Sequence, residues 1–541
     1  MTKPRKNLSK LMASVIGLSL VATTLAACSG GNSAENNTNN TGGAGAESNV
    51  SKDGMPIVKE PLTLSLMAPD VGHAKWEDMA SLKELEKLTN IKLTFQNAPS
   101  DSFATKKNLV FASGTYPDMF YAADLLPSEQ VTYGDQGVLL PLEDLIDQYA
   151  PNLKKILDAN PNIRKNITTP DGHIFALPFI NPTAVLYRNP MWYNGDFLKA
   201  LNIKELPKTT DELYTYLKRV KTEDPNGNGK ADEIPLASVK LTDLRMFFMG
   251  FWGMYNEQYY ADKEGKVHYS PQEEGYKGYL TFLNKLWSED LLDHETFSQT
   301  NEQKEAKIKN NQVGVFDAYH PYMPFKEDQN TKHPMMALVK SEIADSPVYG
   351  KHPGQSAYGQ FAISKTNPNP EAAMRWVDYM YGVDGAALMD LGPEGTLWEY
   401  TNKETKEKKF LPVPNGEKYD DYRGKLTPNY GIVAPGINLP ETKKGLESDF
   451  DLWFKEELKN KIEPYAKTPM PNVFLTPEEQ TEITALFSDL NPYVEQMEAK
   501  FVTGQEPLAN WDKYVAQLKK MGSDRVVEIY QTAYDRWNST K

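Results

Sequence analysis

Segments with the spacing of strands and segments with the spacing of helices follow one another along the first third of the chain. Leu62-Thr63-Leu64-Ser65-Leu66 alternates apolar and polar residues, which indicates a strand, and residues 76–89 have helical spacing. A second strand is predicted at residues 91–95, a helix at 103–112 and a short strand at 118–121. Repeated strand–helix–strand order implies parallel strands joined by crossover helices, so we expect an α/β architecture.

Further strands are predicted at residues 186–189, 313–316 and 358–363, and a strong helix at 371–380. From residue 478 onward the chain is mostly helical by its spacing. Single cores usually divide in chains longer than ~250–300 residues, so a chain of 541 residues is expected to form two lobes. Cys28 is the only cysteine, and stability must therefore come from packed cores without an intramolecular disulfide.

The N-terminus has the pattern of an export signal. Basic residues precede an apolar segment and the small-residue tetrad Leu25-Ala26-Ala27-Cys28. A cysteine in this place resembles the lipobox of bacterial lipoproteins, whose thiol receives a diacylglycerol. The resemblance implies a signal peptide at residues 1–27 and a lipid anchor, with acyl chains such as palmitate, on Cys28. An ordinary signal peptide with a chance cysteine is the alternative.

Residues 28–55 are rich in Gly, Asn, Ser and Thr and have little to bury, which predicts a flexible linker that lifts a folded body off the membrane. We therefore expect the protein on the outer face of the cell membrane, of the Gram-positive type. After the signal, no stretch approaches ~18 uninterrupted apolar residues, so no further span is expected. The chain has 59 Lys and Arg against 73 Asp and Glu, a balance that argues against nucleic acid as a partner.

Residues 224–233 have the spacing of a calcium-binding loop. Oxygen donors occupy positions 1, 3, 5, 7, 9 and 10, and Gly229 at position 6 permits the sharp turn that such loops need. The predicted ligands are Asp224, Asn226, Asn228, the backbone carbonyl of Lys230, Asp232 and Glu233. We expect a structural Ca²⁺ ion there.

The loop departs from an EF-hand at position 12, where Pro235 replaces the bidentate glutamate, so that Glu233 would have to serve instead. This departure predicts a static, EF-hand-like site and not a sensor. The alternative is an Asn-Gly-rich turn without metal. Neither Cys nor His lies nearby, which excludes zinc.

Six segments of the chain, in their order and spacing, resemble the family 1 type of extracellular solute-binding proteins of ABC importers. They are residues 109–120, 171–178, the calcium loop, 287–295, 361–365 and 392–398. The chain is most similar to carbohydrate-binding lipoproteins of Gram-positive bacteria and to alginate-binding periplasmic proteins. In the alginate-binding relatives a loop of the same pattern holds structural calcium.

The resemblance implies a two-lobe periplasmic-binding-protein-like fold of type II, with a hinge and a largely helical C-terminal region. Lobe one is expected at residues 56–179 plus 352–400, and lobe two, with the calcium loop, at 180–351 plus 401–541. The protein would bind a carbohydrate by hinge closure and deliver it to the permease subunits in the membrane, and the size of the chain favours an oligosaccharide. We expect a monomer.

Sugars present C–H faces to aromatic rings and hydroxyls to planar polar groups. The candidate ligand residues at strand ends and lobe crossings are Tyr187, Arg188, Trp192, Trp252, Tyr319, Glu394 and Trp398. Trp252 stands among glycines that leave room beside its ring. For each of these residues, packing in a core is the alternative.

A tethered glycoside hydrolase is the main competing function, because it would share the anchor, the linker and the aromatic residues. It needs two carboxylates about 5–9 Å apart, and with 73 acidic residues such pairs arise by chance. The sequence has no Gly-x-Ser-x-Gly, no His-Glu-x-x-His and no phosphate-binding loop, so we do not expect an enzyme. A surface carbohydrate-binding adhesin is the third possibility. The pattern leaves open whether the solute is a neutral glycan, a uronate-containing glycan or a peptide.

Overall fold

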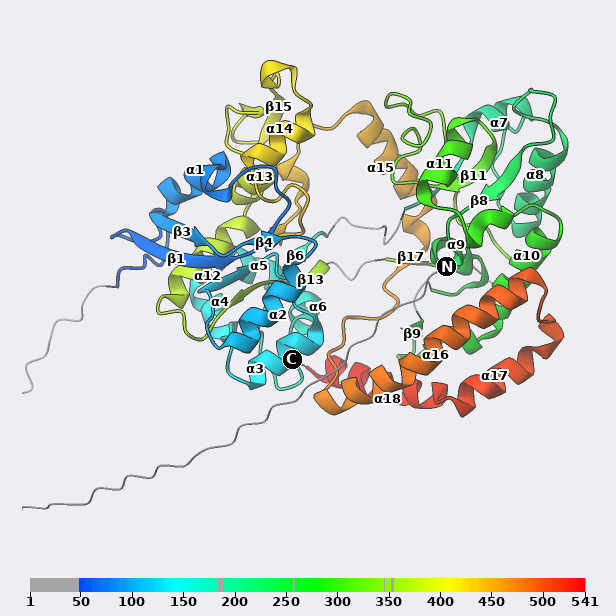
Figure 1. Ribbon diagram of the computed structural model, residues 1–541. Helices are drawn as coiled ribbons and strands as arrows, with labels where there is room; N and C mark the ends of the chain where they lie inside the picture. The colour runs from blue at the N-terminus through cyan, green and yellow to red at the C-terminus, as the bar shows by residue number, and fades with distance from the viewer. Residues whose placement is uncertain are drawn as a thin grey trace, which may run out of the picture. The chain divides into compact units, whose positions relative to one another are not determined.

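The computed structural model describes residues 48–182, 186, 189–255, 258–344, 346–351 and 355–540 (Figure 1). The predicted signal peptide, the lipidation site at Cys28 and most of the linker lie outside these residues, as do the candidate ligand residues Tyr187 and Arg188. Within the described part of the chain, no helix is both long and apolar enough to cross a bilayer.

The first sheet has six strands in the order β16-β6-β13-β5-β1-β3. All neighbours are parallel except β13, which is antiparallel to both β5 and β6. The other strands therefore end at one common edge, and the loops that follow them gather there. The strands are β1 (Leu62–Met67), β3 (Ile91–Phe95), β5 (Met119–Tyr121), β6 (Leu177–Ile180), β13 (Gln355–Ile363) and β16 (Gly436–Ile437).

The helices around this sheet confirm the strand–helix alternation expected from the sequence. In α1 the apolar side chains Leu82 and Leu85 are buried, and Asn90 ends the helix in the left-handed conformation (φ 61°). The strand predicted at 91–95 is β3, and the helix predicted at 103–112 is α2. The helices are α1 (Ala80–Thr89), α2 (Phe103–Ser113), α3 (Pro127–Asp135), α4 (Glu143–Tyr149), α5 (Pro151–Ala159), α6 (Pro161–Asn166), α12 (Pro370–Asp378), α13 (Val383–Leu391) and α14 (Tyr419–Leu426).

The second sheet has three strands in the order β7-β11-β8, with β11 parallel to β8 and antiparallel to β7. The described residues 186 and 189 are not in a strand, although one was predicted at 186–189; β7 begins after Pro190, which has no N–H to pair. The strands are β7 (Met191–Tyr193), β8 (Ile234–Ala237) and β11 (Val313–Asp317), and the helices around them include α7 (Gly195–Ala200), α8 (Thr210–Thr222), α9 (Leu241–Phe248), α10 (Glu274–Ser288), α11 (Asn301–Lys309) and α15 (Asp449–Lys461).

Two separate sets of buried side chains divide the chain into the two expected lobes. The core of lobe two is built from residues 191–349 and 462–530, and the cores of lobe one from residues 57–180 and 361–446. The boundary expected at residue 400 therefore differs from the structure. Strand β16 joins the edge of the first sheet beside β6, and Leu426 and Leu446 pack with Trp398, so that residues 401–446 return to lobe one.

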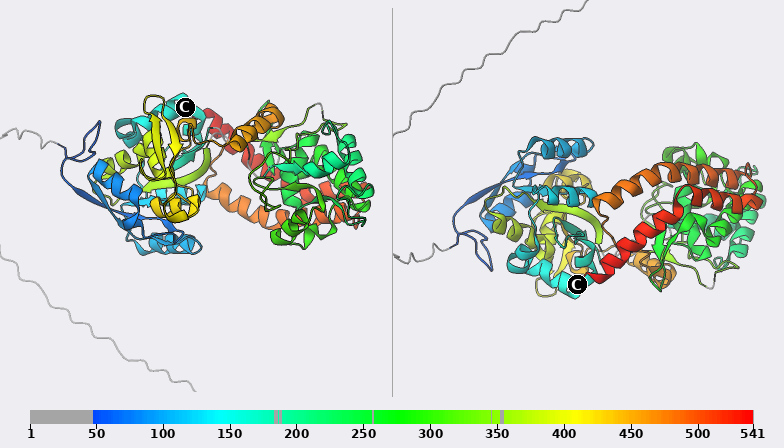
Figure 2. Two further views of the ribbon diagram at one scale, coloured as in Figure 1. Left: turned by 90° about the horizontal axis from the view of Figure 1, so that it is seen from above. Right: turned by 90° about the horizontal axis from the view of Figure 1, so that it is seen from below.

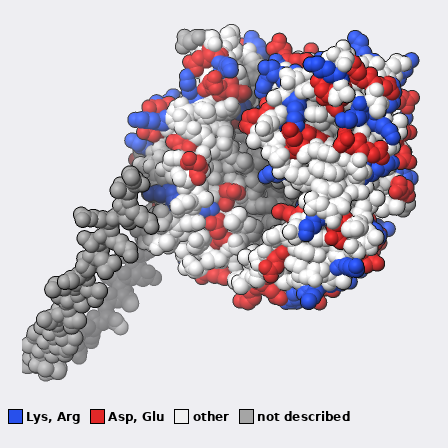
Figure 3. Space-filling view, turned by 45° about the vertical axis from the view of Figure 1, so that its right-hand side comes forward, with Lys and Arg blue, Asp and Glu red and all other residues white. Residues whose placement is uncertain are grey.

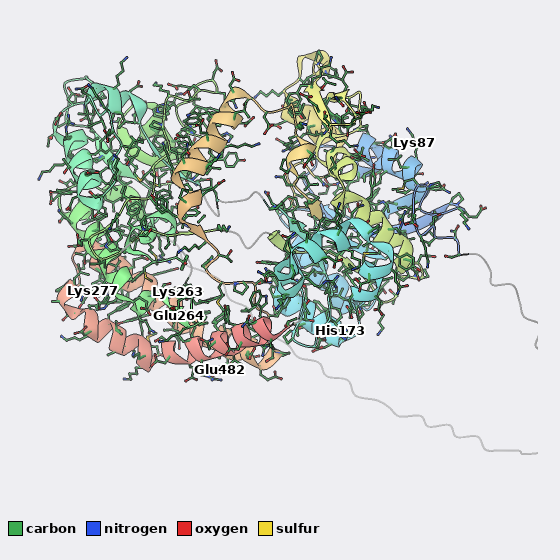
Figure 4. The ribbon with its side chains drawn as sticks, turned by 180° about the vertical axis from the view of Figure 1, so that it is seen from behind. Lys87, His173, Lys263, Glu264, Lys277 and Glu482 are labelled. Carbon is green, nitrogen blue, oxygen red and sulfur yellow. The ribbon has the colours of Figure 1, made fainter. Side chains whose placement is uncertain are left out.

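The C-terminal region is helical, as expected: α16 (Pro477–Thr503), α17 (Trp511–Lys520) and α18 (Ser523–Ser539). Figure 2 shows α16 and α18 running side by side, and Arg525 of α18 donates twice to Glu482 of α16, at 2.7 and 2.9 Å (Figure 4). Helix α16 packs on α10 of lobe two through Val494, Met497 and Phe501, and its Glu498 pairs with Arg245 in the interior.

We expect Gly359→Ala to destabilise lobe one. Gly359 of β13 has φ 63°, and a Cβ at this position would lie 2.1 Å from the carbonyl oxygen of Leu125. The backbone strain and the clash together predict a loss of about 3 kcal/mol in the free energy of unfolding, measured by urea titration. Gly172→Ala is the control, because Gly172 has φ 91° but nothing lies within 4 Å of its added Cβ. Equal losses in the two variants would contradict the close contact with Leu125.

Candidate functional site

The carboxyl-terminal edge of the first sheet is the candidate binding surface of lobe one. In open α/β sheets, ligands bind outside the carboxyl ends of parallel strands. Strands β1, β3, β5, β6 and β16 all end at this edge. Strand β13 is antiparallel, so its first residues lie at the same edge.

The loop after β5 has an unusual backbone. Ala122 (φ 49°) and Asp124 (φ 46°) both adopt the left-handed conformation, which is uncommon for residues other than glycine and clusters at functional sites. Asp124 is exposed to solvent, and Leu126 is 56% exposed. The strained loop therefore presents a carboxylate and an apolar side chain at the centre of the edge.

A hollow of about 200 Å³ lies beside β6 and β16. Its lining combines apolar surface from Phe179 and Val433 with the amides of Asn429 and Asn438. The hydroxyl of Tyr121, the last residue of β5, donates to Oδ1 of Asn429 at 2.6 Å and fixes that side chain. Apolar walls with a few oriented polar groups are the usual composition of a small-molecule site.

A second hollow, of about 410 Å³, lies beyond β1 and β3, where the short strands β2 (Pro69–Asp70) and β4 (Ala98–Pro99) continue their direction. Asp70, Asn97 and Asp101 are among its lining residues. Strands β6 and β1 are separated by β13 and β5, so at about 4.8 Å per strand they lie roughly 14 Å apart. The edge thus has a hollow toward each end and suits an elongated ligand.

Aromatic and charged side chains join the two loop regions of this edge. The ring of His73, which follows β2, lies 5.1 Å from the ring of Tyr430, which precedes β16. The guanidinium of Arg423 lies 4.7 Å from the centre of the Tyr430 ring. The ring contact therefore joins the loop before β16 to the loop after β2, and the cation–π contact joins the loop before β16 to α14.

The opposite end of β6 is fixed by a different contact. His173, labelled in Figure 4, precedes β6, and its Nδ1 lies 2.5 Å from Oε1 of Glu143 on α4. The hydrogen bond to Glu143 raises the pKa of His173 above its ordinary value. This pair anchors the amino-terminal edge and takes no part in the candidate site.

Lobe two has an aromatic surface at the carboxyl end of β11. Tyr319 is 66% exposed, and its ring lies 4.4 Å from the ring of His320. His320 packs edge-on against Phe450 and Phe454, and burial lowers the pKa of its imidazole. The lowered pKa favours the neutral imidazole, and the exposed aromatic ring of Tyr319 beside it suits the apolar face of a ligand.

The structure does not bring the remaining predicted ligand residues together. Trp192 is fully buried under the aromatic surface, where its Nε1 donates to the carbonyl of Ala318 at 2.9 Å. Trp252 is 7% exposed in the core of lobe two, and Trp398 is 3% exposed in a small core of lobe one. Glu394 is exposed and pairs with Lys403 at 3.1 Å.

Trp398 and Glu394 do share a hollow of about 520 Å³ with Tyr400 and Asp384, on the side of α1 and α13. The residues at the carboxyl edge of the first sheet, in lobe one, were not among the predicted ligand residues. A usable sequence indication exists for one of them, because Asp124 follows the apolar strand residues 119–121 after only two alanines.

The predicted calcium loop, residues 224–233, connects α8 to β8 and has a tightly curled backbone. Asp224 (φ 48°), Gly227 (φ 69°) and Gly229 (φ 74°) are all left-handed. The carboxylate of Asp224 accepts from the amide of Gly229 at 2.9 Å, and the carboxylate of Asp232 accepts from the side-chain amides of Asn226 and Asn228. These hydrogen bonds hold the side chains of Asn226 and Asn228 against that of Asp232.

Glu233 is the residue in this loop that most favours a bound cation. It is 2% exposed, and its Oε1 has no hydrogen-bond partner. Burial, together with the nearby Asp224, raises the pKa of its carboxyl group. In the described part of the chain no three His, Cys, Asp or Glu side chains cluster as a metal site by themselves, so the amide and backbone oxygens of the loop would have to complete it.

Comparison with known proteins identifies the family. Residues 74–387 match the model of the bacterial extracellular solute-binding protein family. The chain is 29% identical to the fructooligosaccharide ABC transporter substrate-binding protein FusA of Streptococcus pneumoniae over 486 residues, which cover 85% of this chain and 87% of FusA.

Solved structures give the same result. The structure of FusA in complex with kestose matches with a TM-score of 0.71 at 27% identity, covering 88% of this chain and all of that chain, and an EF-hand mutant of FusA with fructo-nystose matches equally well. The alginate-binding protein AlgQ2 without calcium ion has the same fold, with a TM-score of 0.66 at 24% identity over 89% of this chain and all of AlgQ2. The two-lobe, type II architecture expected from the sequence is thereby confirmed, and the chain belongs to the family of bacterial extracellular solute-binding proteins.

Proposed function

We propose that this protein is the substrate-binding component of an ABC transporter, that it binds an oligosaccharide between its lobes, and that it delivers the sugar to the permease. The observation on which the proposal rests is the long carboxyl edge of lobe one, with Asp124, Asn429 and Asn438 along it and a hollow toward each end. Carboxylates and planar amides suit sugar hydroxyls, and the spread of these groups suits several linked rings. The relatives are substrate-binding transport proteins, which supports a receptor over a hydrolase or an adhesin.

The positions at which the chain crosses between the lobes are consistent with closure of the two lobes over the carboxyl edge of lobe one. Strand β6 leaves the first sheet at Ile180, β13 enters it at Gln355, and β16 leaves it at Ile437, all at the carboxyl edge. The first crossing enters lobe two at the start of β7, which is antiparallel to β11 and so begins beside the aromatic surface. Crossings at the ligand edges of both lobes allow a hinge to close them over a solute.

Charge on the exterior is mixed. Figure 3 shows Lys and Arg side chains interspersed with Asp and Glu over the visible face. At the carboxyl edge itself the acidic residues Asp70, Asp101 and Asp124 are exposed or half-buried, and the nearby Lys443 lies 3.2 Å from Asp390. This balance favours a neutral oligosaccharide over a uronate-containing one.

The proposal is tested by a thermal-shift screen of the soluble chain from residue 29 against kestose, longer fructooligosaccharides, galacturonan fragments and peptides. A ligand at a hundred times its dissociation constant stabilises the folded state by ~2.7 kcal/mol, so we expect a rise of a few degrees in melting temperature with a neutral oligosaccharide. The sugar should be recovered unchanged. Cleavage of the sugar would indicate a hydrolase, and a response only to peptides would contradict the carbohydrate assignment.

We expect Tyr319→Ala to weaken binding of the responding oligosaccharide about fivefold, because an aromatic face contributes ~1 kcal/mol, while the melting temperature without ligand changes little. Calorimetric titration gives the affinity. Phe410→Ala is the matched control, because Phe410 is also an exposed aromatic residue (48%) but lies on β15 (Glu407–Phe410). Affinity unchanged by Tyr319→Ala would show that the aromatic surface of lobe two does not contact the sugar.

We further propose that residues 224–233 hold a structural calcium ion, with Asp224, Asn226, Asn228, the carbonyl of Lys230, Asp232 and Glu233 as ligands. The ion would neutralise the buried carboxylate of Glu233 and supply its missing partner. The loop precedes β8 and so lies at the amino-terminal edge of the second sheet, opposite the aromatic surface. Calcium is therefore expected to stabilise lobe two without contacting the sugar.

We expect 1 mM Ca²⁺ to raise the melting temperature and a chelator to reverse this, with sugar affinity nearly unchanged. At a hundred times its dissociation constant calcium would stabilise by ~2.7 kcal/mol. Asp224→Ala should abolish the response, whereas Glu264→Ala, at an exposed glutamate in the same lobe, should retain it (Figure 4). A chelator without effect on the wild-type melting temperature would exclude the ion.

The calcium response should also depend on pH. Because the pKa of Glu233 is raised in the folded protein, the metal-free folded state binds more protons than the unfolded state just above the ordinary glutamate pKa of about 4.3. The contribution of Glu233 to the free energy of unfolding of the metal-free protein is thus present at low pH and is lost as the pH rises through the pKa of Glu233 in the folded state. Calcium needs the ionised carboxylate, so the melting-temperature gain should be larger at pH 7 than at pH 5. Equal gains would exclude Glu233 as a ligand.

Membrane attachment through Cys28 is likewise proposed, on the sequence pattern and on membership of an extracellular family. We expect wild-type protein in the membrane fraction of a Gram-positive host and Cys28→Ala protein in the medium or retained with its signal uncleaved. Labelling with radioactive palmitate should follow the same difference. Wild-type protein found free in the medium would contradict the anchor.

A further inference from the structure

A buried lysine in lobe one donates hydrogen bonds to the backbone just after strand β5. Lys107 of α2 is 4% exposed. Its Nζ donates to the carbonyl oxygens of Ala123 at 3.2 Å and Asp124 at 3.3 Å, and to Oε2 of Glu129 at 2.8 Å. All three protons of the ammonium group therefore have acceptors, two of them in the strained loop that follows β5.

Lobe two has a lysine in the corresponding place. Lys304 of α11 is also 4% exposed, and its Nζ donates to the carbonyl oxygen of Asp317 at 3.2 Å and to Oδ1 of the same residue at 2.7 Å. Asp317 is the last residue of β11, directly before the segment that contains Tyr319 and His320.

The two lysines occupy matching positions in the topology. In each lobe the helix immediately precedes its strand, α2 before β5 and α11 before β11, and the lysine lies in the first half of the helix. A helix that packs antiparallel to the following strand brings its first half near that strand's carboxyl end. Both lysines thus reach from the helix to the place where the strand ends and the candidate binding surface begins.

Stability does not explain these buried charges. Removing an ammonium group from water costs several kcal/mol, and replacing a buried ion pair by apolar groups is often neutral or stabilising. What the lysines provide is a set of directed, charge-assisted hydrogen bonds to carbonyl groups at or just beyond the ends of the strands.

In lobe one, Lys107 contacts a loop with an unusual backbone conformation, residues 122–126. Ala122 and Asp124 are left-handed, and the amide of Leu126 donates to the same Glu129 oxygen that pairs with Lys107, at 2.8 Å. Without the lysine, the two carbonyl groups would lack their donor, and the loop could relax toward ordinary backbone angles.

We propose that Lys107 and Lys304 are positioning residues, which set the backbone conformation of the segments 122–126 and 318–320 and thereby the affinity for the solute. The effect on affinity rests on the proposed binding role of the two carboxyl edges. The effect on conformation does not, and the two are measured separately.

The test uses two paired variants of the full soluble chain: Lys107→Met with Glu129→Gln, and Lys304→Met with Asp317→Asn. Each pair removes both charges, so that no unpaired carboxylate is left in the interior, while the amide oxygen of the new Gln or Asn still accepts a hydrogen bond. Lys106→Met and Lys309→Met are the matched controls, because both lysines lie on the same helices and are exposed.

Amide hydrogen exchange is measured first, without ligand. Loss of charge-assisted hydrogen bonds should speed exchange at least tenfold in residues 122–126 of the first variant and at 318–320 of the second, with other segments and the melting temperature nearly unchanged. Binding of kestose, or of the oligosaccharide with the largest thermal shift, should weaken about tenfold in each paired variant and remain unchanged in the controls.

Unchanged exchange in these segments would overturn the proposal, and so would faster exchange throughout the protein, which would mean general loss of stability. Faster local exchange with unchanged sugar affinity would overturn the link to binding. If no oligosaccharide binds the wild-type protein, the proposed function fails, and the exchange data alone decide whether the lysines hold the loops.

Discussion

Parallel strand pairing is the constraint on which the rest of this structure depends. It aligns the carboxyl ends of β3, β1 and β5 and of β6 and β16 in lobe one, and those of β8 and β11 in lobe two. Strand β13 is antiparallel to both β5 and β6, so the two groups in lobe one end at the same edge of the sheet, where the following loops gather. Crossovers place helices over the sheets, so the strand ends remain the natural place for polar and aromatic groups. The hollows beside β6 and beyond β1, the aromatic surface and the starts of the lobe crossings lie at these edges.

Elements that depend on local sequence patterns could be predicted, whereas pairing between segments far apart in the chain could not. Strand β3 and helix α2 begin where periodicity predicts, because their apolar residues face a core within their own lobe. The calcium site proposed at residues 224–233 also rests on a local pattern, since all its oxygen donors lie within ten residues of one another. By contrast, β16 pairs with β6, more than 250 residues earlier in the chain, and nothing in two residues, Gly436 and Ile437, indicates that partner.

The same limitation explains why the site residues were hard to predict. Trp398 follows a segment rich in Gly and Pro, which suggested an exposed ring, but Leu426 and Leu446 from residues 401–446 pack against it and bury it. Asn429 has no local pattern of its own, and Asp124 is indicated only by its place shortly after the apolar strand residues 119–121. They matter because a left-handed backbone exposes one and a hydrogen bond from Tyr121 orients the other, and both features depend on distant parts of the chain. Tyr319 was predicted as a ligand residue because it lies three residues after the strand predicted at 313–316.

The two ends of the second sheet carry different features. At the amino end of β8, the left-handed turns of residues 224–233 bring carboxylates together, a costly arrangement that a divalent cation would relieve. At the carboxyl end of β11, a buried lysine holds the chain where the ladder stops. The first arrangement would stabilise the lobe and the second would shape its binding surface. Because about 13 Å of strand separates the two ends of a four-residue strand such as β8, each can vary without disturbing the other. A receptor built in this way can change its solute by altering edge loops while its stability is maintained elsewhere.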